Sequence, residues 1–355
     1  MPVACGRVFV GASRFAPNAP VEHLGGFFRM QAGDEQWTSL SVGLPESPQV
    51  RAVAVHPADP SVVYAGIHDG PYRSTDGGDT WERLAFESTR QAVWSIAFDP
   101  NDRRVMYCGV GPALLYRSSD GGDHWSVVPQ AAIPERLDMG FPTRLISIAV
   151  DPSDASSIYA GVEVGGVMHS ADGGETWADC SPDLIRLAEE HPHLRNRLLS
   201  ETELEGMLDT HALAVSPAAP GRVFLANRMG LFSSDDAGAS WADLQVGNHS
   251  PLTYCRHVTV SPHDPKVLFA CFSDEAQGVA GSVYRSDDLG RGWTRFDRVA
   301  PTSTMMKVGI NPDDPNQVWS ATRDGEVFAT ADGGQTWTEF RLPTGGRDVY
   351  ALCAG

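Results

Sequence analysis

The stretch Ser74-Thr75-Asp76-Gly77-Gly78-Asp79-Thr80-Trp81 decides the fold of this chain, because close variants of it return at intervals along the sequence. The variants are SSDGGDHW ending at Trp125, SADGGETW at Trp177, SDDAGASW at Trp241, SDDLGRGW at Trp293, TADGGQTW at Trp337 and a degenerate copy, MQAGDEQW, at Trp37. Successive tryptophans lie 44, 44, 52, 64, 52 and 44 residues apart. Seven copies at such spacings predict a repeat protein in which each copy marks one structural unit.

The composition of the motif predicts a tight turn between two strands. The two adjacent glycines permit positive φ angles, which a tight hairpin turn requires. The aspartate can accept hydrogen bonds from backbone N–H groups inside the turn, and the tryptophan can fill the space between neighbouring sheets. We therefore expect the motif aspartates to be structural and to lie outside any functional site; they are Asp76, Asp120, Asp172, Asp236, Asp288 and Asp332.

A second unit precedes each motif and supplies two more strands. In the second copy it reads RAVAVHPADPSVVYAG over residues 51–66, which is a strand, a turn containing proline and another strand. Each repeat then has four antiparallel strands, A to D, with the motif between C and D. The chain starts on a B-type strand, RVFVGAS, and ends on an A-type strand, DVYALCAG. We expect these two strands to pair and close the fold into a ring.

These motifs resemble those of the Asp-box, or BNR-repeat, β-propellers. That superfamily includes sialidases, family 74 xyloglucanases, sortilin-type receptors and the photosystem II assembly factor. The resemblance covers the whole chain and implies an all-β fold, a seven-bladed propeller of four-stranded antiparallel blades. Residues 1–355 are expected to form this single domain.

Loop lengths indicate which face of the propeller carries function. The step from the proline after strand A to the aromatic residue of strand B is always seven, as from Pro57 to Tyr64. The B–C and D–A loops vary, and the D–A connection from Trp177 to Pro217 spans 40 residues. Antiparallel connectivity places all the variable loops on one face, opposite the Asp boxes. Loops on a rigid scaffold are where binding and chemistry usually occur.

The longest insertion, residues 181–209 between blades 4 and 5, has helical character. We expect Ser181 to cap a helix that begins at Pro182 and buries the stripe Leu184, Leu187 and Ala188. A second helical piece is expected to continue through Leu194, Leu198 and Leu199. A lid over a pocket and a packing elaboration are equally compatible with this pattern.

Composition excludes several classes of partner. The formal charge is −18 and there is no basic stripe, which argues against nucleic acid and against anionic membranes. No apolar stretch is long enough to span a bilayer, and the N-terminal residues have no pattern typical of a signal peptide. We therefore expect a cytoplasmic protein. No spacing of His or Cys typical of a zinc site is present, and no metal or other cofactor is predicted.

Charged residues at the strand-A entrances and in the B–C loops are expected to surround the central opening of the loop-rich face. The candidates for catalysis are Asp209, His211 and Glu163. The candidates for ligand binding are Arg51, His68, Asp69, Arg144, Arg228, Arg256, His257, Lys307, Arg323 and Tyr350.

The leading functional prediction is a pocket for a small polar or carbohydrate-like ligand, with glycoside hydrolysis as an extension. The alternative is a non-catalytic scaffold that binds a protein partner on the loop-rich face, similar to the assembly factor. The sialidase resemblance implies an arginine triad, for which Arg51, Arg144 and Arg256 are candidates, but the Phe-Arg-Ile-Pro motif of sialidases is absent. Family 74 enzymes use two propellers and paired aspartates, whereas this chain supplies one propeller.

Overall fold

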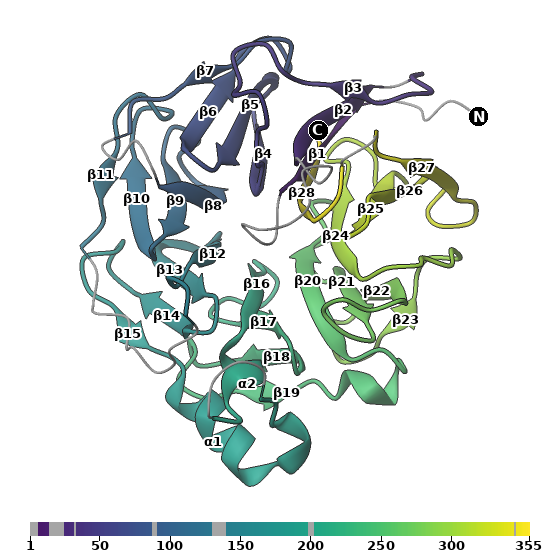
Figure 1. The fold of residues 1–355 in the computed structure, drawn as a ribbon. Helices are drawn as coiled ribbons and strands as arrows, with labels where there is room; N and C mark the ends of the chain where they lie inside the picture. Colours follow the sequence, from purple (N-terminus) through teal and green to yellow (C-terminus); the bar gives the residue numbers. More distant parts are fainter. Residues whose placement is uncertain are drawn as a thin grey trace.

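The computed structural model describes residues 6–13, 25–31, 33–86, 91–129, 140–197, 202–343 and 346–355. Within them, seven four-stranded antiparallel sheets stand around a central axis and form a seven-bladed β-propeller (Figure 1). The predicted fold is confirmed. The innermost strands of neighbouring blades contact each other all the way round the ring, including the contact of β28 with β4.

The strand bounds, from the innermost strand outward, follow the four-strand repeat. Blade 1 contains β28 (Val349–Ala354), β1 (Arg7–Ala12), β2 (Gly26–Gln31) and β3 (Thr38–Ser39). Blade 2 contains β4 (Ala52–His56), β5 (Asp59–Ile67), β6 (Gly70–Ser74) and β7 (Glu82–Arg83). Blade 3 contains β8 (Ala92–Phe98), β9 (Met106–Gly111), β10 (Leu114–Ser118) and β11 (Ser126–Val127). Blade 4 contains β12 (Leu145–Asp151), β13 (Asp154–Val162), β14 (Gly166–Ser170) and β15 (Ala178–Asp179).

The remaining blades repeat the same order. Blade 5 contains β16 (Thr210–Val215), β17 (Val223–Asn227), β18 (Gly230–Ser234) and β19 (Ala242–Asp243). Blade 6 contains β20 (Tyr254–Val260), β21 (Leu268–Ser273), β22 (Gly281–Ser286) and β23 (Thr294–Arg295). Blade 7 contains β24 (Met305–Ile310), β25 (Val318–Thr322), β26 (Glu326–Thr330) and β27 (Thr338–Arg341).

Blade 1 combines the two ends of the described chain in one sheet. Strand β28 pairs antiparallel with β1, in a register that runs from Val8 opposite Ala354 to Ala12 opposite Val349. The Arg7 N–H group donates to the Gly355 carbonyl, and the Gly355 N–H group donates back to the Arg7 carbonyl at 2.8 Å. This pairing gives blade 1 the same four strands as the other blades and covers the inner edge of β1.

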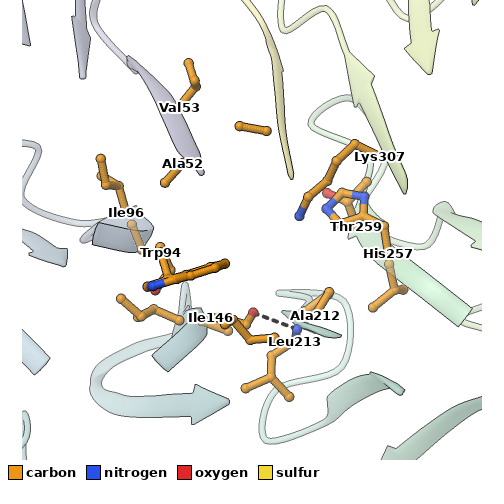
Figure 2. A pocket seen from close by; sticks show the side chains of 18 of the residues that line it. Ala52, Val53, Trp94, Ile96, Ile146, Ala212, Leu213, His257, Thr259 and Lys307 are labelled. Atoms are coloured by element: carbon orange, nitrogen blue, oxygen red, sulfur yellow. Dashed lines mark hydrogen bonds between the residues drawn. The ribbon is translucent and has the colours of Figure 1, made fainter. Parts of the chain in front are cut away.

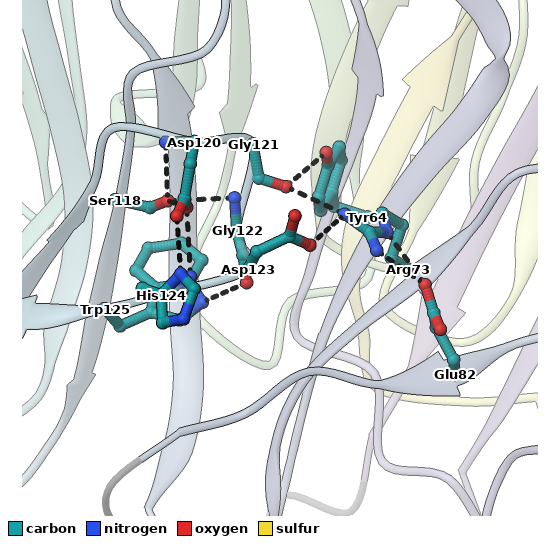
Figure 3. A network of polar contacts seen from close by, with 10 residues as sticks. All are labelled: Tyr64, Arg73, Glu82, Ser118, Asp120, Gly121, Gly122, Asp123, His124 and Trp125. Carbon is teal, nitrogen blue, oxygen red and sulfur yellow. Dashed lines mark hydrogen bonds and ion pairs between the residues drawn. The ribbon is translucent and has the colours of Figure 1, made fainter.

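The Ser or Thr and Asp side chains of each intact Asp box form the same hydrogen bonds inside the turn, as the box of blade 3 illustrates (Figure 3). The Ser118 hydroxyl donates to Asp120 at 2.8 Å and accepts the Gly122 N–H at 2.9 Å. Asp120 also accepts the His124 N–H at 3.0 Å, and the Trp125 indole donates to the Gly122 carbonyl at 2.8 Å. The box aspartates therefore hold the turn, as predicted.

The boxes also fasten neighbouring blades together. From blade 2, the Tyr64 hydroxyl donates to the Gly121 carbonyl at 2.8 Å, and Arg73 pairs with Asp123 at 2.8 Å (Figure 3). The box tryptophans pack into the cores between blades, where Trp81 of blade 2 lies 5.0 Å from Phe27 of blade 1, measured between ring centroids. Repeated turns thus supply both the hairpin and the contact between sheets.

The insertion between blades 4 and 5 contains α1 (Pro182–Glu190), a 3₁₀ turn η1 (Pro192–Leu194) and α2 (Glu205–Leu208). A further 3₁₀ turn, η2 (Val246–Asn248), follows β19. Leu184, Leu187 and Ala188 are buried as predicted and join a core with blades 4 and 5. None of the helices in the described ranges is long and apolar enough to cross a membrane.

Two details of the insertion differ from the sequence prediction. Ser181 does not cap α1 with its side chain, because its hydroxyl instead accepts the Val167 N–H of β14 at 3.2 Å. Among the described residues of the second helical piece only η1 is helical, and α2 lies at Glu205–Leu208, immediately before β16. Leu198 and Leu199 lie outside the described residues.

Candidate functional site

Two cavities follow the axis of the propeller. The mouth pocket, of about 380 Å³, opens among the variable loops and is lined by Phe141, Glu163, Val164, Asp209, His211, Arg228, Tyr254, Arg256, Glu275, Ala276, Gln277, Arg323 and Tyr350. The channel cavity, of about 400 Å³, lies among the innermost strands (Figure 2). Its lining includes Arg51, Trp94, His257, Lys307 and Tyr350. Tyr350 lines both cavities.

A β-bulge positions many of these side chains. In six of the seven innermost strands the pairing register shifts near the start of the strand and leaves one residue unpaired. The unpaired residues are Trp94, Ile146, His211, Arg256, Met306 and Tyr350. All except Met306 line one of the two cavities. A bulge re-aims a side chain, and bulges are common beside functional sites.

Asp209 is the centre of a buried polar network. Its carboxylate lies 3.2 Å from His211 Nε2 and accepts from Arg228 Nε at 3.0 Å. The His211 side chain is only 2% exposed and that of Asp209 only 6%. His211 Nδ1 lies 2.7 Å from the Cys255 carbonyl, and the Tyr254 hydroxyl lies 3.4 Å from Nε2. Because the carbonyl can only accept, the Nδ1 atom carries the proton of the neutral imidazole.

The charges around this network move both pKa values downward. Burial alone would raise the pKa of Asp209, but its contacts with His211 and the charges of Arg228 and Arg256 lower it to about 2. Burial lowers the pKa of His211 to about 4, assisted by the positive charge of Arg256. At neutral pH the pair is therefore an aspartate beside a neutral histidine. If Nε2 accepts a proton, the resulting imidazolium can donate a hydrogen bond to Asp209.

Glu163 is the second buried acid of the mouth pocket. It follows β13 and pairs with Arg144 at 2.9 Å, with both side chains about one-fifth exposed or less. Burial raises its pKa, and the charge of Asp209 acts in the same direction against the opposing charge of Arg144. These two carboxyl groups thus have pKa values displaced in opposite directions.

Guanidinium groups cover the aromatic rings around the mouth. Arg144 lies over Trp94 and Phe141, with its central carbon 4.4 Å and 4.8 Å from the ring centroids. Arg51 also lies over Trp94, at 4.6 Å. The same arrangement joins Arg228 to Tyr254 at 5.5 Å and Arg256 to Tyr350 at 5.6 Å. These contacts stabilise the cations without neutralising their charge.

Arg256 differs from the other arginines of the mouth pocket. Arg228 is neutralised by Asp209 at 3.0 Å, and Arg323 lies 3.3 Å from Asp348. Within the described ranges Arg256 forms no ion pair or hydrogen bond with a carboxylate, and its ring contact is with Tyr350. It is half-buried in β20 at the bulge. The mouth pocket therefore presents one arginine that has no carboxylate in direct contact among the described residues. Burial alone would lower its pKa, but the charges of Tyr254, Tyr350, Asp209 and Glu163 raise it.

Two non-glycine residues at the mouth have left-handed backbone. Val164, which lines the pocket, has φ of 53°, and Asp348, the partner of Arg323, has φ of 51°. This conformation is a genuine outlier for a β-branched residue, and such strain gathers at ligand and active sites. It supports the assignment of function to this face.

The structure brings most of the predicted residues together. Asp209, His211, Glu163, Arg228, Arg256, Arg323 and Tyr350 line the mouth pocket, while Arg51, His257, Lys307 and again Tyr350 line the channel cavity. Arg144 reaches the mouth through its ion pair with Glu163. His68 and Asp69 line neither cavity: the His68 ring accepts the Gln49 N–H at 3.4 Å, and Asp69 lies 3.8 Å from Arg83.

Sequence reasoning missed part of the pocket wall. Val164, Ala276 and Gln277 line it from the B–C loops, and no chemical signal in their residue types distinguishes them. Tyr254 also lines the pocket, where it lies under Arg228 beside His211. No group of three or more His, Cys, Asp or Glu side chains suited to a metal ion occurs in the portion of the chain that the structure describes.

Comparisons with known proteins agree with the fold. A family model described as the BNR/Asp-box repeat matches residues 72–83. A xyloglucanase of Paenibacillus sp is 31% identical over 352 residues, covering 89% of this chain and 29% of the relative. The GH74 xyloglucanase structure from Xanthomonas campestris has a TM-score of 0.65 at 22% identity, covering 99% of this chain and 55% of that one. YCF48 bound to a D1 peptide has a TM-score of 0.54 at 17% identity, covering 84% of both chains.

The lengths of these proteins differ from that of the present chain. It spans 29% of the Paenibacillus relative and 55% of the Xanthomonas campestris enzyme, but 84% of YCF48. The alignments with the two solved structures are below 25% identity and concern the fold. The side chains of the mouth pocket must therefore carry any argument about its ligand.

Proposed function

We propose that this BNR-repeat propeller, which resembles both GH74 xyloglucanases and YCF48, binds a small polyhydroxylated ligand with one carboxylate in its mouth pocket. The observation that carries the proposal is Arg256, whose charge has no carboxylate partner among the described residues. A ligand carboxylate would supply that partner through charge-assisted hydrogen bonds, which are about twice as strong as neutral ones.

The other charged groups of the pocket suit hydroxyl groups on the ligand. Asp209 and Glu163 each hold one arginine, which leaves further lone pairs on their carboxylates to accept from hydroxyls. His211 and Tyr254 add polar atoms at the same wall. An acidic sugar, such as a uronic acid, combines the carboxylate and the hydroxyls that this arrangement would recognise.

The aromatic rings favour an acidic ligand over a neutral sugar chain. Neutral sugars commonly bind by laying an apolar face on an exposed aromatic ring. Here Arg144 lies over Phe141, Arg228 over Tyr254 and Arg256 over Tyr350. Since each of these rings already has a guanidinium over one face, the pocket offers positive charge where a neutral sugar would need apolar surface.

Isothermal titration calorimetry with glucuronate and methyl glucoside tests this proposal. We expect wild type to bind glucuronate more tightly than methyl glucoside, and Arg256→Gln to weaken glucuronate binding roughly 10- to 100-fold. Arg222→Gln is the matched control, because Arg222 pairs with the exposed Asp235 away from the pocket. Equal binding of the two sugars, or equal binding by wild type and Arg256→Gln, would contradict the proposal.

Hydrolysis is the second candidate function, supported by the opposite displacement of two pKa values. Burial raises the pKa of Glu163, as a general acid requires, while the pKa of Asp209 is lowered to about 2. Release of reducing ends from uronic acid-containing oligosaccharides measures this activity, and Glu163→Gln should abolish it while retaining glucuronate binding. Binding without turnover in wild type would leave a non-catalytic module, for which the likeness to YCF48 is the precedent.

A further inference from the structure

The channel cavity differs from the mouth pocket in the sign of its charge. Glu163, Asp209 and Glu275 line the mouth pocket together with three arginines. The channel cavity is lined by the cations Arg51 and Lys307, and no Asp or Glu is among its described lining residues. Two positive charges thus face a carboxylate-free space inside a protein whose formal net charge is −18.

Lys307 is a half-buried cation that has no carboxylate partner among the described residues. It lies on β24, and Figure 2 shows its side chain extending into the cavity beside His257 of β20. No hydrogen bond or ion pair of its amine is formed with the described residues. Burial and the nearby charge of Arg256 lower the pKa of Lys307 to about 8. A bound anion would relieve this electrostatic cost.

Arg51 also has no carboxylate partner among the described residues. In that part of the chain its guanidinium donates only to Gln49, at 3.1 Å to the side chain and 3.4 Å to the carbonyl, and it lies over Trp94. The Nε atom of Arg51 is buried and has no hydrogen-bond partner within the described ranges. Burial is the main reason that its pKa falls to about 10. A buried donor without a partner is destabilising, and an acceptor in the cavity would remove that cost.

His257 adds a neutral donor to the same wall. Its Nδ1 atom accepts the Val308 N–H at 3.4 Å, and burial holds its pKa well below the ordinary value, so the ring is neutral. The proton of the neutral ring is then on Nε2, which can donate. The polar groups of the cavity thus combine two cations with an N–H donor, a set that suits a ligand group that only accepts and carries more than one negative charge.

We propose that the channel cavity binds a phosphate dianion through Lys307 and His257, with Arg51 as a second cation in the lining of the same cavity. The dianion is either free phosphate or the phosphate group of a ligand that also occupies the mouth pocket, since Tyr350 lines both cavities. Binding of free phosphate would be independent of the function proposed for the mouth pocket. Binding of a ligand that occupies both cavities rests on that proposed function and implies a phosphorylated acidic sugar.

The sequence provides a clean comparison for the key cation. Lys307 is one of only two lysines in the chain; the other, Lys266, is exposed in the turn between β20 and β21. Titration calorimetry with inorganic phosphate should therefore be compared among wild type, Lys307→Met, Arg51→Gln and the control Lys266→Met. We expect each channel variant to bind phosphate at least tenfold more weakly than wild type, and Lys266→Met to match wild type.

A second readout protects the test against misfolding of a channel variant. Reductive methylation with ¹³C-formaldehyde gives each lysine its own NMR signal in the wild-type protein, assigned with the two lysine variants. Phosphate should shift the Lys307 signal and leave that of Lys266 in place. Absence of both phosphate binding and a Lys307 shift at millimolar phosphate would overturn the proposal, as would equal binding by wild type and both channel variants.

Glucuronic acid 1-phosphate distinguishes the two sources of the phosphate. If it binds no more tightly than inorganic phosphate, the channel takes the free ion. If it binds more tightly, and both Lys307→Met and Arg256→Gln weaken it, the phosphate belongs to a ligand that spans the two cavities. Loss of glucuronate binding in Arg256→Gln with unchanged phosphate binding separates failure of one site from failure of the other.

Discussion

At the scale of single residues, a buried hydroxyl group, from serine in five of the intact Asp boxes and from Thr330 in the sixth, anchors the turn. The Ser74 hydroxyl donates to Asp76 at 2.7 Å and accepts the buried Gly78 N–H at 2.7 Å. Ser74→Ala leaves that N–H group without a partner, so we expect the free energy of unfolding to fall by about 1–3 kcal/mol. Urea denaturation measures the loss. Ser126→Ala, at an exposed serine, is the control, and an equal effect in both variants would contradict this account.

The buried His211 predicts a dependence of stability on pH. The unfolded chain takes up its proton near pH 6.5, whereas the folded chain does so near pH 4. Stability is therefore complete above about pH 6.5 and decreases as the pH falls towards 4, by about 3 kcal/mol for this group. Denaturation midpoints at pH 7 and pH 4.5 should differ less in His211→Gln than in wild type.

The control for this pH effect is His193→Gln. His193 is exposed on η1, so its replacement should leave the difference between the two midpoints unchanged. If His211→Gln keeps the full pH dependence of wild type, the loss of stability at low pH arises from other groups.

The sequence predicted which charged residues lie at the mouth, but it did not predict the directions in which their side chains point. The strand-A pattern located His211, Arg256 and Tyr350 near the central opening. It gave no sign of the bulge that leaves each of these residues unpaired, because a bulge depends on how two strands register rather than on residue type. His68 shows the opposite case, since an imidazole in a B–C loop is bound to a local backbone N–H.

Helix α1 is the element whose role the sequence left open. Leu184 is fully buried in a core shared with blades 4 and 5, and Asp183 accepts the Trp241 N–H at 2.7 Å. Leu184→Ala should lower the free energy of unfolding by about 2–5 kcal/mol, because the helix packs as part of the core. Arg186→Ala, which removes only exposed ion pairs, should change it by less than about 1 kcal/mol.

Hydrogen exchange on the same variants separates a packed helix from a mobile lid. A packed α1 exchanges slowly in wild type and faster in Leu184→Ala. Fast exchange of α1 in wild type, with no loss of stability in Leu184→Ala, would indicate a lid.

The sequence predicted this helix, but it did not predict the hydrogen bond that Ser181 forms at its start. The apolar stripe from Leu184 to Ala188 follows from the helical period. Ser181 has the residue type and position of a cap, yet its hydroxyl bonds to Val167 of the neighbouring hairpin. A tertiary hydrogen bond replaced the local one, which no pattern within the helix reveals.

Closure by β28 determines the cooperativity of the whole molecule. Removal of residues 349–355 exposes the inner edge of β1 and the buried faces of neighbouring blades, so we expect unfolding at lower urea concentration with a broader transition. A circular permutant opened at an exposed turn, such as the one after Asp264, keeps the β1–β28 pair and should unfold as cooperatively as wild type. Equal midpoints for the truncated and intact chains would contradict this role.

The global architecture could be predicted best, because the same four-strand pattern recurs in all seven repeats. The constant A–B step and the variable loops also distinguished the two faces correctly. What the repeat could not supply was the pattern of charge neutralisation inside the ring. Whether Arg228 meets Asp209 while Arg256 meets no described carboxylate depends on side chains from different blades.

The pairing of β1 with β28 also has a mechanical consequence. Arg7 and Gly355 meet at one end of an antiparallel pair, so tension applied between them loads the hydrogen bonds one rung at a time. Such a pair peels open at a lower force than one pulled along its length, where many rungs share the load. Stretched by its ends, the ring should therefore yield first at blade 1, and the other six sheets should then unravel in succession.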